Sequence, residues 1–580
     1  MIEQRYRWKN KQIREQLSVL SQEVTPTLVL KDATYLHSKL RRFLTQNIWI
    51  HEDRIVYCGP ELPSKINESN IISLEGKVVV PGYIEPHVHP FQLYNPQSFA
   101  LYASKFGTTT LIQDNLMLAL LLEKKKAFTL LRKFRQLPVS LYWWSRFDSQ
   151  TVLGMEDDPF THANVKSWLE HDAVLQGGEL TAWPQLLAGD DMLLHWVQEA
   201  KRMRKRVEGH LPGASPLTLT KMALAGVDSD HESISGEDVY QRLLAGLTVS
   251  LRHSSIRPDI PKILEELKKY DLTNYDDFMM TTDGSSPSFY KEGVSNILVK
   301  LAIDNGVPVV DAYQMVTANV AKYYRIDHLH GEIAPGQVAN VNILDHMLEP
   351  KPSAVLSKGV WIVDMEGNQY EPEEVNWKEY DLAPLSLDWS LQSDDLQFSM
   401  PFGLEMVDAV ITKPYSIGID PYTDALLEQG DECFLMLVDR EGRWRINTLL
   451  KGFAKSIGGL CSSFSSSGDL LLIGKSKEDM LEAFEEMKRM KGGIVLVQKG
   501  EVEARVSLSI AGTMSDKPLE ELMIEESKFS AKMKEHGYSF QDPIYSLLFF
   551  CSTHLPYIRL TSQGIYDVMK KTILFPTIMR

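Results

Sequence analysis

The chain has only four cysteines in 580 residues: Cys58, Cys433, Cys461 and Cys551. They lie far apart and form no CxxC pair, which excludes a thiolate zinc site and a disulfide framework as the organising feature of the fold. Cysteine usage of this kind is typical of proteins in a reducing compartment. We therefore expect a cytoplasmic protein.

The chain also lacks a long apolar run and an excess of positive charge. Its longest apolar run, residues 116–122, is far shorter than the roughly 20 residues that a membrane span needs. The charged N-terminal stretch has no central apolar segment that could serve as a signal peptide. A formal net charge of −16 disfavours nucleic acids and anionic membranes as partners. These absences leave a small-molecule partner as the expectation.

The middle of the chain alternates strand and helix patterns over about 250 residues, which predicts a (β/α)₈ barrel at residues 78–330. Its candidate strands are VVVPGYIE, TTTLIQD, HDAVLQ, RVEGH, GVDSDH, TVSLRH and FMMTTD. The expected fold class is therefore α/β.

The segments on both sides of the predicted barrel are rich in β-type residues. Residues 26–77 and 331–370 are expected to pair into one small β-sandwich, because a barrel inserted into a β-domain leaves both flanks to complete it. The remaining segments are an N-terminal helix at 1–25, a linker at 371–395 and a C-terminal α/β domain at 396–580.

The segment VVVPGYIEPHVHP, residues 78–90, carries His87 and His89 one residue apart. On a strand, residues two apart share a face and lie about 7 Å apart. Two imidazoles at that spacing can converge on one metal ion, whose bonds to nitrogen are about 2.0–2.1 Å long. Such a pair alone is more often structural, so its surroundings decide the interpretation.

Ligand-type side chains follow several candidate strands, at the end of the barrel where active sites lie. Singly, each would be read as a helix cap or a surface residue, but six in order predict one site. Histidine and carboxylate donors without thiolates suit zinc, manganese or iron. The six residues are His87, His89, Glu179, His210, His231 and Asp283.

These segments resemble a known group of enzymes. PGYIEPHVHP is similar to the first-strand signature of the amidohydrolase superfamily, and the order HxH, acidic residue, His, His, Asp also matches. Within that superfamily, GGELTAWP and VEGHLPGASPLTLTKMALAGVDSDHES resemble segments of adenine deaminases, and GGIVLVQKGEVEARVSLSIAGTMSD resembles their C-terminal domain. The resemblance covers nearly the whole chain.

The resemblance implies a centre of two divalent transition-metal ions, manganese or iron, with zinc as the alternative. It assigns the strand-end imidazoles and carboxylates as ligands: His87, His89 and Asp283 to one ion, His210 and His231 to the other, and Glu179 as the bridge. A hydroxide held between the ions would attack C6 of adenine and release ammonia, leaving hypoxanthine. Asp283 would act as general base and then as general acid.

Further expectations from the resemblance concern substrate and assembly. Glu232 would face the ring nitrogens of the substrate, although a helix-capping role is equally compatible with its position. The C-terminal domain would cover the barrel mouth or build a subunit interface, and a homo-oligomer is expected. The zinc deaminases with an H-x-E and PCxxC signature are excluded, because this chain has no PCxxC.

Three departures separate this chain from typical adenine deaminases. Their DPHEIAN segment reads Gln113-Asp114-Asn115-Leu116 here, and their paired aspartates after the eighth strand are Asp283-Gly284. Their histidine-containing HDSHN segment falls at residues 461–468, where this chain has no histidine. Two alternatives therefore stay open: hydrolysis of another amino-heterocycle or cyclic amide, and a non-catalytic relative that keeps the fold.

Overall fold

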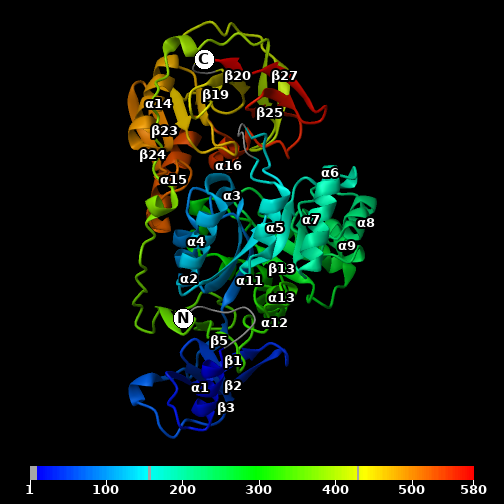
Figure 1. Ribbon diagram of the computed structural model, residues 1–580, viewed down its shortest axis with the longest axis vertical. Helices are drawn as coiled ribbons and strands as arrows, with labels where there is room; N and C mark the ends of the chain where they lie inside the picture. Colours follow the sequence, from blue (N-terminus) through cyan, green and yellow to red (C-terminus); the bar gives the residue numbers. More distant parts are fainter. Residues whose placement is uncertain (1–8, 154–157, 428–429) are drawn as a thin grey trace.

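Three bodies follow one another along the long axis of the computed structural model, which describes residues 9–153, 158–427 and 430–580 (Figure 1). A small sheet lies at one end, a barrel in the middle and a second sheet at the other end. Helix α1 spans Asn10–Leu20, whereas the first eight residues of the predicted N-terminal helix lie outside the described residues.

The middle body is a barrel of eight strands that neighbour one another in chain order. All adjacent pairs are parallel, as successive strand–helix units require. Thr281 on the last strand donates a hydrogen bond from its hydroxyl to the His87 carbonyl oxygen on the first, at 2.9 Å. The predicted (β/α)₈ barrel is confirmed. Its strands are β6 (Tyr83–Val88), β7 (Thr108–Asp114), β8 (Ser140–Ser145), β9 (Val174–Leu180), β10 (Arg206–Gly209), β11 (Ser229–Asp230), β12 (Thr248–Arg252) and β13 (Phe278–Thr281).

The strand list from the sequence was wrong at two places. The third strand, β8, has the sequence SLYWWS and was not among the candidates. The candidate VVVPGYIE is two strands, because β5 (Val78–Pro81) belongs to the flanking sheet and only β6 belongs to the barrel.

Helices surround the barrel and pack one apolar face each against it. In α7 the buried residues Leu193, Trp196, Val197 and Ala200 recur at the three- and four-residue spacing of one helical face. The helices between the strands and after them are α2 (Pro96–Lys105), α3 (Leu116–Leu121), α4 (Lys124–Phe134), α5 (His162–Glu170), α6 (Trp183–Leu187), α7 (Asp191–Arg202), α8 (Pro216–Ala225), α9 (Gly236–Leu244), α10 (Ile260–Leu267), α11 (Ser295–Asp304), α12 (Val309–Gln314) and α13 (Ala318–Tyr323).

Both flanks of the barrel contribute to one sheet. The chain leaves this sheet through β5, and β14 pairs with β5 in the antiparallel sense when the chain returns. A buried cluster that includes Leu30, Ile48 and Val341 joins residues from both flanks. The strand order is β16 (Val360–Val363), β15 (Ala354–Ser357), β14 (Val341–Leu344), β5, β1 (Leu28–His37), β2 (Arg42–His51) and β3 (Arg54–Gly59), with β4 (Ile71–Ser73) beside β1.

A connection without α-helix or strand links this sheet to the C-terminal body and follows the outside of the barrel (Figure 1). Gln97 on α2 holds it, since its amide donates to the Glu373 carbonyl at 2.8 Å and accepts from the Val375 amide at 3.1 Å.

Among the described residues, no helix is long and apolar enough to cross a membrane.

The C-terminal body is a mixed sheet with helices α14 (Lys477–Met490) and α15 (Leu519–Glu535) beside it. A shorter helix, α16 (Pro543–Phe549), lies between this sheet and the barrel (Figure 1). The sheet strands are β18 (Thr412–Ser416), β17 (Phe402–Met406), β20 (Trp444–Lys451), β19 (Glu432–Val438), β22 (Leu470–Gly474), β21 (Gly459–Ser462), β23 (Gly493–Gln498) and β24 (Glu501–Ser507), with β28 (Ile578–Met579) beside β20. A separate small sheet contains β25 (Ile558–Thr561), β26 (Gly564–Asp567) and β27 (Thr572–Pro576).

Candidate active site

All eight barrel strands place a charged or imidazole side chain at the same end of the barrel. Five of them, β6, β9, β10, β11 and β13, position the six residues singled out from the sequence. The other three add residues that the sequence argument did not assign to the site: Asp114 at the end of β7, Arg146 after β8 and Arg252 at the end of β12. The end of the barrel that carries these side chains faces the C-terminal body.

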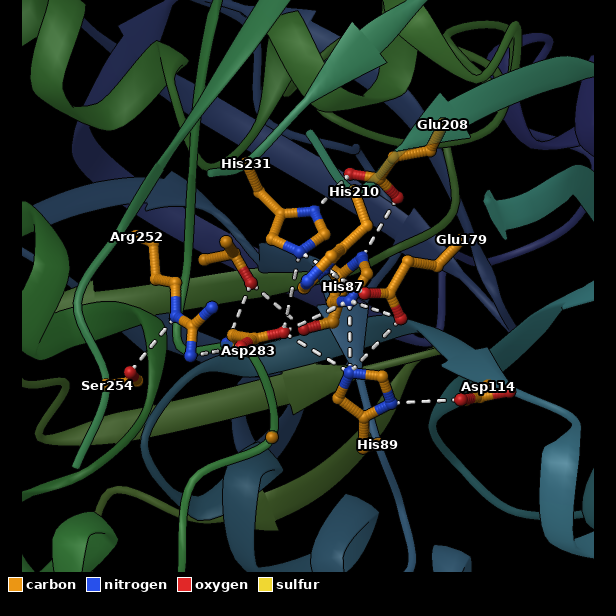
Figure 2. A network of polar contacts seen from close by, with 12 residues as sticks. His87, His89, Asp114, Glu179, Glu208, His210, His231, Arg252, Ser254 and Asp283 are labelled. Atoms are coloured by element: carbon orange, nitrogen blue, oxygen red, sulfur yellow. Dashed lines mark hydrogen bonds and ion pairs between the residues drawn. The ribbon is translucent and has the colours of Figure 1, made fainter. Parts of the chain in front are cut away.

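Three of the predicted residues form a tight triangle of donor atoms. The Nε2 atoms of His87 and His89 lie 3.2 Å apart, and each lies 3.2 Å from Asp283 Oδ1. Figure 2 shows these side chains pointing toward one another from β6 and β13. Ligands bonded to one ion at about 2.1 Å stand about 3.0–3.4 Å apart in octahedral or tetrahedral geometry. The triangle therefore has the dimensions of one face of a metal coordination sphere.

A second group of donors lies beside the first and shares Glu179 with it. Glu179 Oε1 is 2.6 Å from His210 Nδ1 and 3.5 Å from His231 Nε2. Its other oxygen, Oε2, faces the first group at 3.9 Å from His87 Nε2 and 3.7 Å from His89 Nε2. One carboxylate thus presents one oxygen to each group of imidazoles.

Several of these buried donor atoms make no well-formed hydrogen bond among the described residues, although each lies within ion-pair distance of an oppositely charged group. They are Glu179 Oε2, His210 Nδ1, His231 Nε2 and Asp283 Oδ1. Buried polar atoms without a well-formed hydrogen bond are rare, so four of them around one point favour a group that binds there. A divalent cation fits, because imidazole nitrogens and carboxylate oxygens are donors that cations accept.

The outward-facing nitrogens of three imidazoles are each held by a carboxylate. His89 Nδ1 donates to Asp114 at 2.9 Å, and Glu208 accepts from His87 Nδ1 at 2.9 Å and from His231 Nδ1 at 3.2 Å (Figure 2). When Nδ1 carries the proton, the lone pair of Nε2 faces the centre and is free to bind a metal ion. This is the arrangement that orients metal-binding histidines.

Glu208 was missed in the sequence argument, although it precedes His210 by two residues on β10. That spacing places both side chains on the same face of the strand and was the available signal. The pKa of Glu208 falls to about 2 because the neighbouring imidazoles of His87 and His231 outweigh its burial, so the group is a carboxylate.

We expect Glu208→Gln to weaken metal binding by about 10- to 100-fold, because an amide supports the Nδ1 protons of two imidazoles less well than a carboxylate does. Equilibrium dialysis against buffered metal measures the change. Glu199→Gln on α7 is the matched control, since Glu199 is also buried but pairs with Arg202. An unchanged affinity in Glu208→Gln would show that this carboxylate does not support the ligands.

Two buried arginines neutralise the carboxylates of the site. Arg146 donates to Asp114 at 3.0 and 2.9 Å and lies 2.9 Å from Glu179 Oε2. Arg252 lies 2.8 Å from Asp283 Oδ2 (Figure 2). Although burial opposes it, Arg252 and the neighbouring imidazoles hold the pKa of Asp283 well below its usual range. Asp283 is therefore ionised, with one oxygen toward the imidazoles and one toward the guanidinium.

The helix-cap alternatives for Asp283 and Glu232 do not describe this structure. Ser286 is the N-cap of the turn of 3₁₀ helix after Asp283, and Ser235 is the N-cap of α9 after Glu232. Glu232 instead accepts a hydrogen bond from Arg252 Nη1 at 2.5 Å and pairs with Arg257.

Gly284 stands where adenine deaminases have a second aspartate, and the backbone explains the difference. Its φ is +62°, and a Cβ atom at this position would lie 2.6 Å from the backbone nitrogen of His89. Only glycine fits this close approach of the Asp283 loop to the backbone of His89.

A cavity of about 160 Å³ lies over the donor cluster and extends to the C-terminal body. Its wall is mainly apolar, and the residues that form this wall include Phe91, Leu116, Met117, Ile256, Leu548 and Phe549. Tyr545 on α16 donates a hydrogen bond to the Gly284 carbonyl at 3.1 Å. The C-terminal body therefore covers the barrel mouth, one of the two roles expected from the sequence.

The histidine that the C-terminal body supplies to this cavity is His554, which was not foreseen. In the segment 461–468, where related sequences carry histidine, Ser466 lines the cavity instead. The His554 ring packs edge-on against His210, with centroids 5.7 Å apart.

Comparison with known proteins fits this geometry. Residues 78–365 match the model of the amidohydrolase family, and residues 409–572 match the model of the adenine deaminase C-terminal domain. A protein of Halalkalibacterium halodurans named "Putative adenine deaminase" is 53% identical over 582 residues, covering 100% of both chains. The chain belongs to the adenine deaminase family.

Other members of the adenine deaminase family span the same length. A Bacillus subtilis protein named "Putative adenine deaminase YerA" is 49% identical over 100% of both chains. The protein of Methanococcoides burtonii named "Adenine deaminase" is 25% identical over 97% of this chain and 98% of its own. Membership of this family makes the chain a hydrolase of the amidohydrolase superfamily, and its buried cluster of histidine and carboxylate donors is consistent with a metal site of the amidohydrolase type.

Proposed function

We propose that this protein deaminates adenine hydrolytically to hypoxanthine and ammonia, using two divalent ions, manganese or iron, with zinc as the alternative. The observation that carries the proposal is the pair of donor groups that share Glu179, since one group alone would account for a single ion. His87, His89 and Asp283 would hold one ion, His210 and His231 the other, and Glu179 would bridge them. When bound, the ions would supply a nucleophilic water of lowered pKa at neutral pH.

In this proposal Asp283 moves the proton that the reaction requires. Its ionised carboxylate accepts a proton from the attacking water, and Arg252 fixes its orientation at 2.8 Å. A carboxyl group of low pKa, once protonated, is a strong acid and passes the proton on to the departing amino nitrogen. The bond between C6 and that nitrogen then breaks, and ammonia leaves.

The cavity supports a small, flat and neutral substrate. Its volume of about 160 Å³ is below the roughly 300–1,000 Å³ of sites for drug-sized ligands, so a free base suits it better than a nucleotide. Apolar walls stabilise an aromatic ring, and Arg252 and Arg257 are already paired with carboxylates rather than available to an anion.

A panel of amino-heterocycles tests the substrate. We expect protein reconstituted with Mn²⁺, Fe²⁺ or Zn²⁺ to release ammonia from adenine with a higher kcat/KM than from pterins or aminopyrimidines, with hypoxanthine as product. If another heterocycle releases ammonia and adenine does not, that heterocycle would be the substrate, and the proposed metal-dependent hydrolysis would still hold. Absence of turnover across the panel in metal-loaded protein would refute the proposed activity.

A further inference from the structure

Two residues that line the cavity each carry a buried polar atom with no hydrogen-bond partner among the described residues. The two atoms are Gln92 Oε1 and His554 Nδ1. Both atoms are buried, so bulk water does not supply the missing hydrogen bonds. Because buried amides and imidazoles are almost always hydrogen-bonded, these two groups are positioned for a ligand.

Both side chains are carried by loops that the two bodies hold between them. The loop of Gln92 follows β6, and its Leu93 carbonyl accepts a hydrogen bond from the Ser515 amide at 2.6 Å. Asn95 reinforces this contact by donating to the Ser515 carbonyl at 2.8 Å. The position of Gln92 therefore depends on docking of the C-terminal body.

The loop of His554 is held in the same way from the other side. Thr151, in the loop after β8, donates from its hydroxyl to the Cys551 carbonyl at 2.6 Å, and the Thr553 amide donates to the Gln150 carbonyl at 2.8 Å. The ring itself packs edge-on between His210 and Phe549, with centroid distances of 5.7 Å to each. These contacts fix the ring beside the donor cluster.

We propose that Gln92 and His554 recognise the ring nitrogens of the substrate heterocycle and set its specificity. The inference rests on the proposed function and deepens it, because a ring with both N–H donors and bare nitrogen acceptors complements an amide and an imidazole, each of which donates and accepts. The apolar walls would contact the faces of the ring, and Gln92 and His554 would form hydrogen bonds with the nitrogens at its edge. A site built in this way rejects analogues that leave its polar groups unpaired.

Substitution of Gln92 or His554 distinguishes a role in substrate binding from a role in folding. We expect Gln92→Leu and His554→Phe each to raise KM for adenine about 10- to 100-fold with little change in kcat, because a hydrogen bond to a non-reacting ring nitrogen stabilises substrate and transition state alike. Phe keeps the ring contacts of His554, and His554→Asn, which restores a donor and an acceptor, should recover part of the affinity. His346→Phe is the matched control, since His346 is exposed and lies in the flanking sheet region.

The decisive experiment measures binding of adenine and its 1-deaza, 3-deaza, 7-deaza and 9-methyl analogues to metal-loaded Asp283→Asn protein, in which turnover is expected to be about 10²–10⁴-fold slower, on a time scale shorter than one turnover. We expect at least one analogue to bind more weakly than adenine to the Asp283→Asn protein. Adding Gln92→Leu or His554→Phe to this protein should remove the difference for the analogue that lacks the nitrogen contacted by the replaced side chain. If each analogue loses the same affinity relative to adenine with and without the second substitution, the inference is overturned and the proposed function is left intact. If the parent protein neither binds nor deaminates adenine, both proposals fail.

Discussion

Asp283→Asn should reduce turnover of adenine by about 10²–10⁴-fold while keeping most of the bound metal. The amide oxygen of Asn can still face the imidazoles of His87 and His89, but an amide cannot accept a proton at neutral pH. The rate of hypoxanthine formation and the metal content of the same preparation measure the two effects.

Asp277→Asn provides the matched control for this change. Asp277 is exposed and lies immediately before β13, the strand whose other end carries Asp283. We expect the control to keep the parent rate. A rate within a few-fold of the parent in Asp283→Asn would show that another group moves the proton.

Glu179→Gln should lose one metal ion per chain and most of the activity. Glu179 Oε1 faces His210 and His231, whereas Oε2 faces His87 and His89, so one negative charge serves both groups. Without that charge, no anion would lie between the two cations that these groups would hold. Metal analysis after gel filtration, with adenine turnover on the same sample, measures the outcome.

The size-matched control is Glu170→Gln, an exposed residue at the end of α5 in the turn that leads to β9. Folding can be checked by comparing thermal unfolding of the two variants. Retention of two ions and full activity in Glu179→Gln would require a different bridge.

The sequence predicted the barrel, and that six ligand-type residues meet at one end of it, for one physical reason. Parallel strands end at a common edge, so ligand-type residues that follow successive strands must meet there. The six residues could be recognised because each lies at or after the end of a candidate strand. The same rule would have included Arg252, but positive charges were not considered as parts of a metal site, where they neutralise surplus carboxylates. Arg146 could not be found in this way, because the strand before it, β8, was not among the candidates.

Two features could not be read from local pattern. The strand SLYWWS is buried at every position and has no alternation, so its aromatic run did not distinguish a strand from a helix segment. His554 reaches the site through contacts between residues some 400 positions apart, as the hydrogen bond from Thr151 to Cys551 illustrates. No periodicity encodes such docking, and only the folded chain reveals which loop covers the barrel mouth.

Titration of metal-free protein with Mn²⁺, monitored by the rate of hypoxanthine formation from adenine, tests the central claim most directly. We expect no turnover after chelation and a rate that rises with added metal to a plateau at two ions per chain. Full activity in the metal-free protein, or a plateau at one ion per chain, would contradict the account of a shared two-metal centre built on Glu179.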